Sequence, residues 1–270
     1  MSPRLFLRVL SLEARTQMSY RGNFWLNVFA GFIAEFGVTY FVWKAVFRES
    51  GRQVVAGYTF EALVLYYLAV VLLGKLVRGR EFEAAVSTDI YEGGLNRYLV
   101  LPASYAAFKY AQRLGQLVPG FIQVAFFGVA TLALLGLTPG PGITPLSVAM
   151  TLVALGIANL LYYLLDNVVH FVAFWADNVW SLDVAKWFVA SLLGGFMVPL
   201  RMFPDGMRQV LEYLPFRFLF DFPARVLFGE IGPVEWMGGV CLGLFWCVLA
   251  WLAGRLVWYR GRLRYTGVGI

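Results

Sequence analysis

Long uninterrupted apolar stretches are the feature that most constrains how this chain can fold. They lie at about 24–47, 59–79, 112–137, 146–168, 184–200 and 236–258. Each is near the roughly 20 residues that a helix needs to cross a hydrocarbon layer about 30 Å thick, and the fifth is short. Lipid cannot hydrogen-bond to the backbone, so a spanning segment is a helix or part of a closed barrel. The stretches lack the alternation of barrel strands, which predicts six transmembrane helices.

Composition places these stretches in a membrane rather than in a soluble core. Of the 270 residues, 60% are hydrophobic and only 14% are charged, whereas soluble domains carry roughly 25% charged residues. The formal net charge of +6 would suggest a nucleic-acid partner in a soluble protein, but excess Lys and Arg are typical of cytoplasmic loops. We therefore predict an all-α integral membrane protein, a single transmembrane domain over residues 1–270, that binds no nucleic acid.

The distribution of Lys and Arg predicts the orientation of a six-span chain. One side carries fifteen of them: four in 1–23, six in 75–113, one in 166–187 and four in 255–264. The other side carries seven, three in 44–52 and four in 201–225. Positive residues near span ends favour the cytoplasm. Both termini are therefore expected to be cytoplasmic, in a multi-pass protein of the inner (plasma) membrane.

The segment 1–23 precedes the first span and has no continuous apolar core, so it is not expected to be a cleaved signal peptide. Drawn as a helix, it places Leu5 and Val9 toward one face while Arg4 and Arg8 lie toward headgroups or water. Such a helix suits the membrane surface. An interfacial elbow helix is one interpretation, and a simple basic anchor is the other.

Residues 79–104 face the cytoplasm in this orientation. Apolar residues recur along the segment, while Gly93 and Gly94 interrupt the helical pattern and Pro102 closes it. A short bent helical element is predicted. Exposed Leu, Tyr and Val side chains on such an element usually mark a contact surface. A partner protein is therefore one interpretation, and packing against the membrane surface or the elbow helix is the alternative.

Three motifs resemble one family of membrane proteins. Residues 90–102 follow the pattern I-x-x-G-x-L-x-x-x-L-x-x-P, residues 20–36 read YRGNFWLNVFAGFIAEF, and residues 194–230 form a proline-rich stretch before the last apolar run. Together they resemble the permeases of type-2 ABC exporters, in particular the bacterial branch of ABC-2 family transporter proteins. The resemblance covers essentially the whole chain.

What the resemblance implies is a cytoplasmic coupling helix between spans two and three, which docks in a groove of a separate ABC ATPase subunit. ATP and Mg would be bound by that subunit. The docking residues that it implies are Asp89, Ile90, Glu92, Gly93, Leu95, Arg97, Leu99 and Pro102. We refer to 79–104 as the coupling segment.

The segment 199–234 holds five of the eleven prolines and many aromatic residues. Proline removes a backbone donor, so this outer segment cannot be one straight span. Asp205 is a fair N-cap for a short helix over 206–214. The resemblance implies re-entrant helices that close the exit of a pathway, with Phe203, Tyr213 and Phe216 as candidate gate residues. The alternative is an interfacial cap that only stabilises the bundle.

Charged residues inside or beside the apolar runs are the remaining candidates for chemistry. Glu35 lies in mid-span, where an ionised carboxylate is costly, so it is expected to face protein or water, as a pathway residue or as a structural one. Asp166, His170, Asp177 and Asp183 gather after the fourth run, without a zinc-binding pattern. Asp183 and Lys186 can pair one helical turn apart. The two cysteines lack metal-ligand or disulfide spacing.

No G-x-x-x-x-G-K-[ST] phosphate cradle occurs in the chain, so it is not expected to be an ATPase or another enzyme, or to bind a cofactor or metal. We predict the membrane subunit of an ABC exporter that works with an ATPase and a second permease, either a copy or a homologue, and contacts membrane lipid. The apolar character suggests a lipophilic or amphipathic substrate. The alternatives are a membrane enzyme that uses Glu35, Asp166 or His170, and a scaffold that transports nothing.

Overall fold

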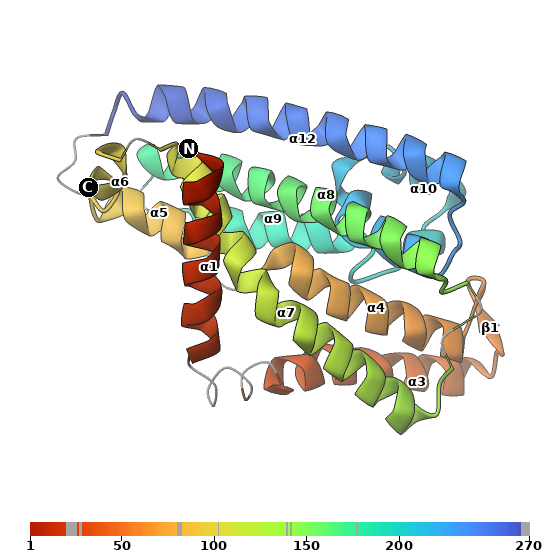
Figure 1. Ribbon diagram of the computed structural model, residues 1–270. Coiled ribbons are helices and arrows are strands. Elements are labelled where there is room, and N and C mark those ends of the chain that lie inside the picture. Colours follow the sequence, from red (N-terminus) through yellow and green to blue (C-terminus); the bar gives the residue numbers. More distant parts are fainter. Residues whose placement is uncertain are drawn as a thin grey trace.

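Helices make up nearly all of the regular structure (Figure 1). The computed structural model describes residues 1–19, 26, 29–79, 83–101, 103–138, 140, 142–176 and 178–265. Pro102 and Asp177 lie outside the described residues, as does most of the start of the motif at 20–36.

The chain begins with a helix and alternates long helices with short turns. In chain order, the elements are α1 (Pro3–Ser19), the π-helical turn η1 (Ile33–Gly37), α3 (Val38–Ser50), β1 (Val54–Val55), β2 (Tyr58–Thr59), α4 (Phe60–Arg78), α5 (Glu83–Tyr91), α6 (Asn96–Leu99), α7 (Tyr105–Leu135), α8 (Pro145–His170), η2 (Phe171–Phe174), α9 (Trp180–Leu193), η3 (Leu200–Met202), α10 (Asp205–Leu211), η4 (Pro215–Phe218), α11 (Asp221–Leu227) and α12 (Pro233–Gly261). The strands β1 and β2 form an antiparallel hairpin in which Val54 pairs with Thr59.

Among the described residues, five helical stretches are long and apolar enough to cross a membrane, and they agree with five of the six predicted spans. They are Phe29–Ser50, Phe60–Arg78, Tyr105–Leu135, Pro145–Phe174 and Pro233–Gly261. The remaining predicted span, the fifth in chain order at 184–200, is not one continuous helix. Its helix α9 has 14 residues, which span about 21 Å, less than the hydrocarbon thickness.

Local sequence explains where these helices begin and end. The Thr59 hydroxyl accepts the Ala62 N–H at 3.2 Å and caps α4. At the start of α8, Thr144 and Ser147 form a reciprocal capping box with Pro145 in the first turn. Gly136 ends α7 in the left-handed region, at φ 64°. Polar caps and glycine thus set the span boundaries, while the apolar runs set their length.

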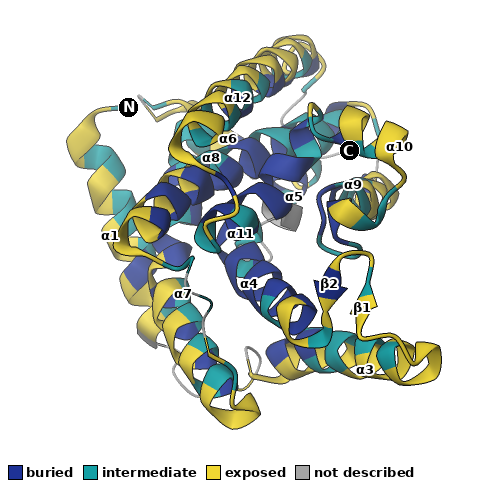
Figure 2. Ribbon diagram, turned by 90° about the vertical axis from the view of Figure 1, so that its right-hand side faces the viewer, coloured by how far each residue is buried: buried dark blue, intermediate teal, exposed yellow. Residues whose placement is uncertain are grey.

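The helices lie roughly side by side, and the coupling segment and the outer segment lie at opposite ends of the bundle (Figure 1). We call the end with α5, α6, η2 and the C-terminal end of α12 the inner end, following the orientation predicted from charge. The end with the hairpin and α10 is the outer end. Seen along the bundle, α4, α8 and α11 are its buried centre, while α3 and α12 present much exposed surface (Figure 2).

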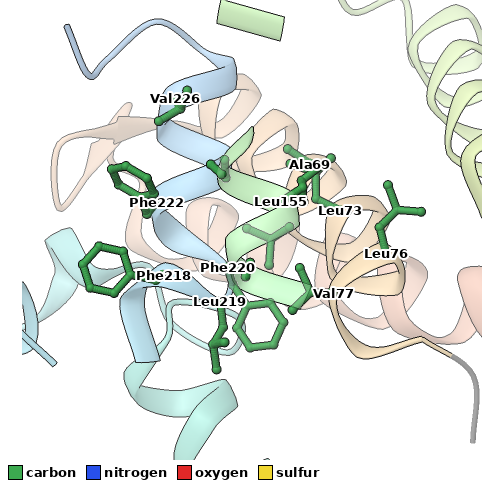
Figure 3. Packing of buried hydrophobic residues seen from close by; sticks show 14 of the residues in the cluster. Ala69, Leu73, Leu76, Val77, Leu155, Phe218, Leu219, Phe220, Phe222 and Val226 are labelled. Atoms are coloured by element: carbon green, nitrogen blue, oxygen red, sulfur yellow. The ribbon is translucent and has the colours of Figure 1, made fainter. Parts of the chain in front are cut away.

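The outer segment re-enters the bundle and supplies part of its core. Phe218, Phe220 and Phe222 are almost fully buried and pack beside Leu155 of α8 and Leu73 of α4 (Figure 3). The N–H of Asp221 donates to the Gly194 carbonyl at 2.9 Å, so the returning chain is bonded to the end of α9. Helix α11 is therefore a buried element between α4 and α8, and not a loop lying over them.

Helix α1 runs across the bundle and crosses α7 at Gly115 (Figure 1). A Cβ at Gly115 would lie 2.5 Å from the Leu10 carbonyl oxygen and 2.7 Å from the Glu13 Cβ. Gln116 adds a hydrogen bond to the Glu13 carboxylate at 3.2 Å. The contact therefore depends on glycine at 115, and it agrees with an N-terminal helix that lies across the spans.

Replacing Gly115 by alanine is expected to destabilise the chain by about 1–3 kcal/mol, because overpacking forces backbone against backbone. The matched control is Gly156→Ala in α8, where a Cβ meets nothing within 4 Å, so the better helix propensity of alanine stabilises by up to about 1 kcal/mol. Thermal unfolding in detergent measures both changes. Shifts of the same sign would show that α1 does not pack on α7 as described.

Candidate functional site

The coupling segment is a bent helical element at the inner end, as the sequence predicts. Helix α5 ends at Tyr91, the chain turns through Gly93 in the left-handed region at φ 75°, and α6 follows. The Leu95 N–H donates to the Asp89 carbonyl at 2.7 Å, which folds the start of α6 back onto α5. Only glycine adopts the conformation at 93 without strain.

Asp89 holds this element to α7. Its carboxylate accepts from Lys109 at 2.7 Å, from the Tyr105 hydroxyl at 2.9 Å and from Arg97 at 2.8 Å. Hydrogen bonds between a carboxylate and a cation are charge-assisted and are stronger than those between neutral groups. Asp89 and Lys109 are both buried. Asp89 is therefore placed to fix the angle between α5 and α7, and it is not on the surface that a partner could touch.

Burial also corrects the expectation that the apolar residues of the coupling segment are exposed. Leu95 is 0% and Ile90 1% exposed. Both pack in a cluster with Phe171 and Phe174 of η2, and Trp258 of α12 packs against it. The tight turn at Gly93 directs these side chains inward, which helical periodicity alone could not show.

A smaller set of residues forms the exposed edge of the coupling segment. Of the predicted docking residues, Glu92, Arg97 and Leu99 lie on the surface, and the neighbouring Val100 is 81% exposed. We define the exposed edge as Glu92, Asn96, Arg97, Leu99, Val100 and Leu101. Three apolar side chains in succession at the inner end have no cover within the described part of the chain. This edge, rather than Ile90 or Leu95, is the surface that another protein could contact.

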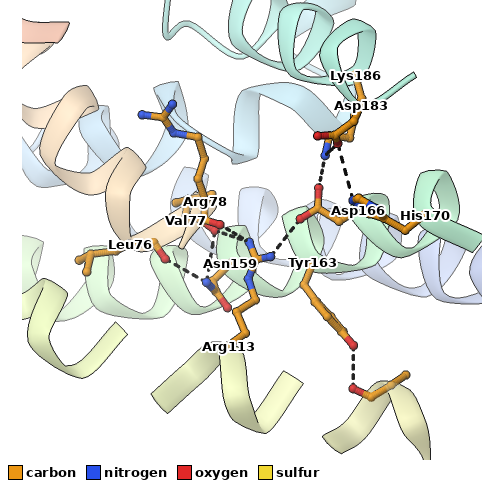
Figure 4. A network of polar contacts seen from close by, with 11 residues as sticks. Leu76, Val77, Arg78, Arg113, Asn159, Tyr163, Asp166, His170, Asp183 and Lys186 are labelled. Atoms are coloured by element: carbon orange, nitrogen blue, oxygen red, sulfur yellow. Dashed lines mark hydrogen bonds and ion pairs between the residues drawn. The ribbon is translucent and has the colours of Figure 1, made fainter. Parts of the chain in front are cut away.

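Behind the coupling segment, a buried polar network joins four helices (Figure 4). Arg113 of α7 donates to Asp166 of α8 at 2.9 Å, and to the carbonyls of Val77 and Arg78 at 2.9 and 2.8 Å. A cation at the last carbonyls of α4 is favourable for the helix dipole. Asn159 of α8 donates to the Leu76 carbonyl at 2.9 Å. The inner ends of α4, α7 and α8 are thus tied at one point.

Helix α9 joins the network through Lys186. Its ammonium pairs with Asp166, and with Asp183 one turn away at 2.6 Å. The predicted Asp183–Lys186 pair is confirmed. His170 of α8 lies 3.7 Å from Asp183. Among the described residues, no group of three or more His, Cys, Asp or Glu side chains could hold a metal ion.

The two polar clusters adjoin one another. A void of about 10 Å³ lies between them, lined by Val86 of α5, by Lys109 and Arg113 of α7, and by Tyr163, Asp166, Asn167 and His170 of α8. Tyr163 also donates to the Ala106 carbonyl at 2.7 Å. Asp89 and Asp166 are therefore both held by cations of α7 only one helical turn apart. Helices α5 and α8 are thus bonded to neighbouring turns of the same helix.

Glu35 lies in the π-helical turn η1 and faces Arg78 of α4 at 3.3 Å. Its side chain is 37% exposed, while that of Arg78 is 16% exposed. The Arg78 guanidinium also lies over the Phe196 ring, 4.5 Å from its centroid. A π-helical turn inside a helix is rare and frequently marks a functional position. The carboxylate thus has a protein partner and keeps an open side.

The candidate gate residues are not brought together. Tyr213 is exposed, and Phe203 and Phe216 are half-buried. Phe216 packs against the central core and Phe203 follows η3. The expected N-cap role of Asp205 is wrong: it is the first residue of α10 and makes no capping bond. Its carboxylate instead pairs with Arg208 at 2.8 Å, and Pro204 occupies the cap position.

Asp221 is a candidate that the sequence interpretation missed. It is fully buried at the start of α11, where it accepts from the Tyr66 hydroxyl at 3.2 Å and lies 3.7 Å from Arg225. A buried carboxylate is costly unless it is paired and hydrogen-bonded, so these two partners hold α11 in place. The only sequence signal is an acidic residue within an otherwise apolar stretch.

One family of sequences matches the chain over residues 33–269, and its description is ABC-2 family transporter protein. The match includes the coupling segment, the outer segment and four complete candidate spans. Of the remaining span, Phe29–Ser50, it omits only the first residues. No curated protein matches the chain closely enough to add a named relative.

Proposed function

The chain belongs to the ABC-2 family of transporter proteins, and we propose that it is the permease subunit of an ABC exporter. It would move a lipophilic or amphipathic substrate out of the cytoplasm with energy from ATP hydrolysed by a separate subunit. Family membership implies that an ABC ATPase is the partner. A second permease would complete the pathway, because five or six helices are too few to enclose a wide route for such a substrate.

The contacts of the coupling segment carry this proposal. Its exposed edge would dock on the ATPase, while its buried side is bonded to α7 through Asp89 and packed on η2 and α12. Arg113 then connects α7 to α4 and α8, and Lys186 connects α8 to α9. A movement of the docked ATPase would reach α7, α4, α8 and α9 through three charged side chains, Asp89, Arg113 and Lys186. ATP binding can shift the permease from one conformation to another only through contacts that differ between the two conformations.

The Glu35–Arg78 pair and the outer segment supply the proposed route. Glu35 would meet the substrate at the surface shared with the second permease, since its carboxylate keeps an open side at η1, directly before α3. Toward the outer end, the half-buried Phe216 would line the gate, and opening it would require α11 to shift against Tyr66. Phe203 and Tyr213 would lie at the mouth.

Affinity purification of the full chain from membranes of its host, followed by mass identification of the bound chains, tests the proposal. We expect an ABC ATPase to copurify. In inside-out vesicles, a lipophilic compound recovered with the complex should accumulate only with ATP, and only while the phosphate-binding lysine of the ATPase is intact. Purification without an ATPase, or turnover of a substrate by the chain alone, would overturn the proposal in favour of a scaffold or an enzyme.

A further inference from the structure

A cavity of about 410 Å³ lies at the inner end, between α6, the start of α7, α8 and α12. Its deep wall is apolar and buried, formed by Tyr105, Phe171 and Ala250. Tyr105 and Trp258 stack with their centroids 5.4 Å apart, and Phe171 lies 4.9 Å from Trp258. These rings keep the cavity open by bracing α7 and η2 against α12.

The rim of the cavity is exposed and carries a positive charge. Leu99, Trp251 and Arg255 lie on it, and all three are exposed. The Arg255 guanidinium lies over the Trp251 ring, 5.3 Å from its centroid, and no described carboxylate pairs with it. Ser104, which precedes the first turn of α7, completes the polar part of the rim. A helix N-terminus favours negative charge.

The position of the cavity along the bundle matches that of a membrane surface. The cavity residues Leu164 and Asn167 lie on the same two turns of α8 as Asp166 and His170 of the polar network. Arg113 of that network is two residues from Gly115, where the amphipathic α1 crosses α7. An amphipathic helix lies at the headgroup boundary, which places the inner end of the bundle, where the cavity lies, close to that boundary.

We infer that this cavity binds a phospholipid with an anionic headgroup from the inner leaflet. The phosphate meets Arg255 and the start of α7, and an acyl chain fills the space between Tyr105, Phe171 and Ala250. Trp251, on the rim, is the kind of ring that membrane interfaces favour. Because Tyr98 and Leu99 of the coupling segment form one side of the cavity, the bound lipid supports the element that the ATPase would touch.

Native mass spectrometry of the purified chain, incubated with dioleoyl-phosphatidylglycerol or dioleoyl-phosphatidylcholine, tests the inference. We expect one retained phosphatidylglycerol and a preference over phosphatidylcholine. Arg255→Gln should lower that preference about fivefold, the effect of one positive charge at an anionic surface. The matched control Arg260→Gln, exposed on the same helix but off the cavity, should leave it unchanged.

A second pair of variants tests the acyl-chain site. Ala106 lines the cavity and Ala107 does not, so Ala106→Phe should reduce retention of both lipids while Ala107→Phe should not. Three results would overturn the inference: equal lipid binding by the Arg255 and Arg260 variants, full retention by Ala106→Phe, or displacement of the lipid by glycerol phosphate alone. A change of oligomeric mass on Ala106→Phe would also overturn it, by assigning the cavity to a second copy.

The inference uses the membrane location and not the exporter assignment. The measurement needs neither ATPase nor transported substrate, so its failure would leave the proposed function standing. Conversely, a chain that copurifies with no ATPase could still retain phosphatidylglycerol at Arg255.

Discussion

Val100→Asp is expected to release the ATPase subunit while the chain itself stays folded. Val100 is 81% exposed, so the substitution removes no internal packing. In the docked complex, however, it would place a carboxylate in an apolar contact. A charged group buried without a partner costs about 2 kcal/mol or more, which is about a 30-fold loss of affinity. Binding of the purified ATPase to the detergent-solubilised chain measures it.

Two further variants make the result specific to the exposed edge. Leu263→Asp introduces the same charge at another exposed apolar residue, 74% exposed and just beyond α12, and it should leave ATPase binding intact. Leu95→Asp would instead place a charge in the buried cluster beside Phe171 and lower the stability of the chain itself. If Val100→Asp binds the ATPase as tightly as the unchanged chain, the docking surface lies elsewhere.

Arg113→Met should destabilise the chain by about 3–5 kcal/mol, because breaking a buried ion pair leaves a buried charge with fewer partners. Arg113 serves Asp166 and two carbonyls at once. Lys186 still pairs with Asp166, which limits the loss. Thermal unfolding in detergent measures it. Arg208→Ala removes the exposed pair with Asp205 and should cost less than about 1 kcal/mol.

Arg113→Lys separates the role of the charge from that of the guanidinium geometry. Lysine keeps the charge but cannot present donors in a planar fork to a carboxylate and two carbonyls. We expect stability between those of the unchanged chain and Arg113→Met. In the complex, ATP hydrolysis should continue while transport falls, since the helices are no longer tied together. Equal stability of all three chains would show that the network does not join the helices.

Much of the architecture follows from local sequence, because a span is set by the length of an apolar run. The fifth run breaks that rule since Gly195 adopts φ 88° and the chain leaves α9 there to meet Asp221. The residues on both sides of this turn are apolar, so the sequence pattern does not reveal that the helix ends there. Only the returning segment, with its Tyr66 contact, explains why the helix ends so early.

In the candidate site, too, contacts between residues close in sequence can be predicted, while contacts between distant residues depend on the tertiary fold. Asp183 and Lys186 are predictable as partners because a helix brings residues three apart together. Arg113 and Asp166 are 53 residues apart, so only the tertiary fold pairs them, and local sequence identifies Arg113 simply as a cytoplasmic charge. The burial of Leu95 likewise depends on η2 and α12, neither of which is near it in sequence.

The buried place of α11 has a consequence for biogenesis. Helices α4 and α8 leave the ribosome well before residue 227, the end of α11. At about 5–20 residues per second, α11 is completed several seconds after α8. Until then, the surfaces that will receive Phe220 and Phe222 lack their partners, and the Tyr66 hydroxyl lacks Asp221. The nascent chain therefore forms α4 and α8 before the buried helix that packs between them, and those apolar surfaces face lipid or another protein until α11 is made.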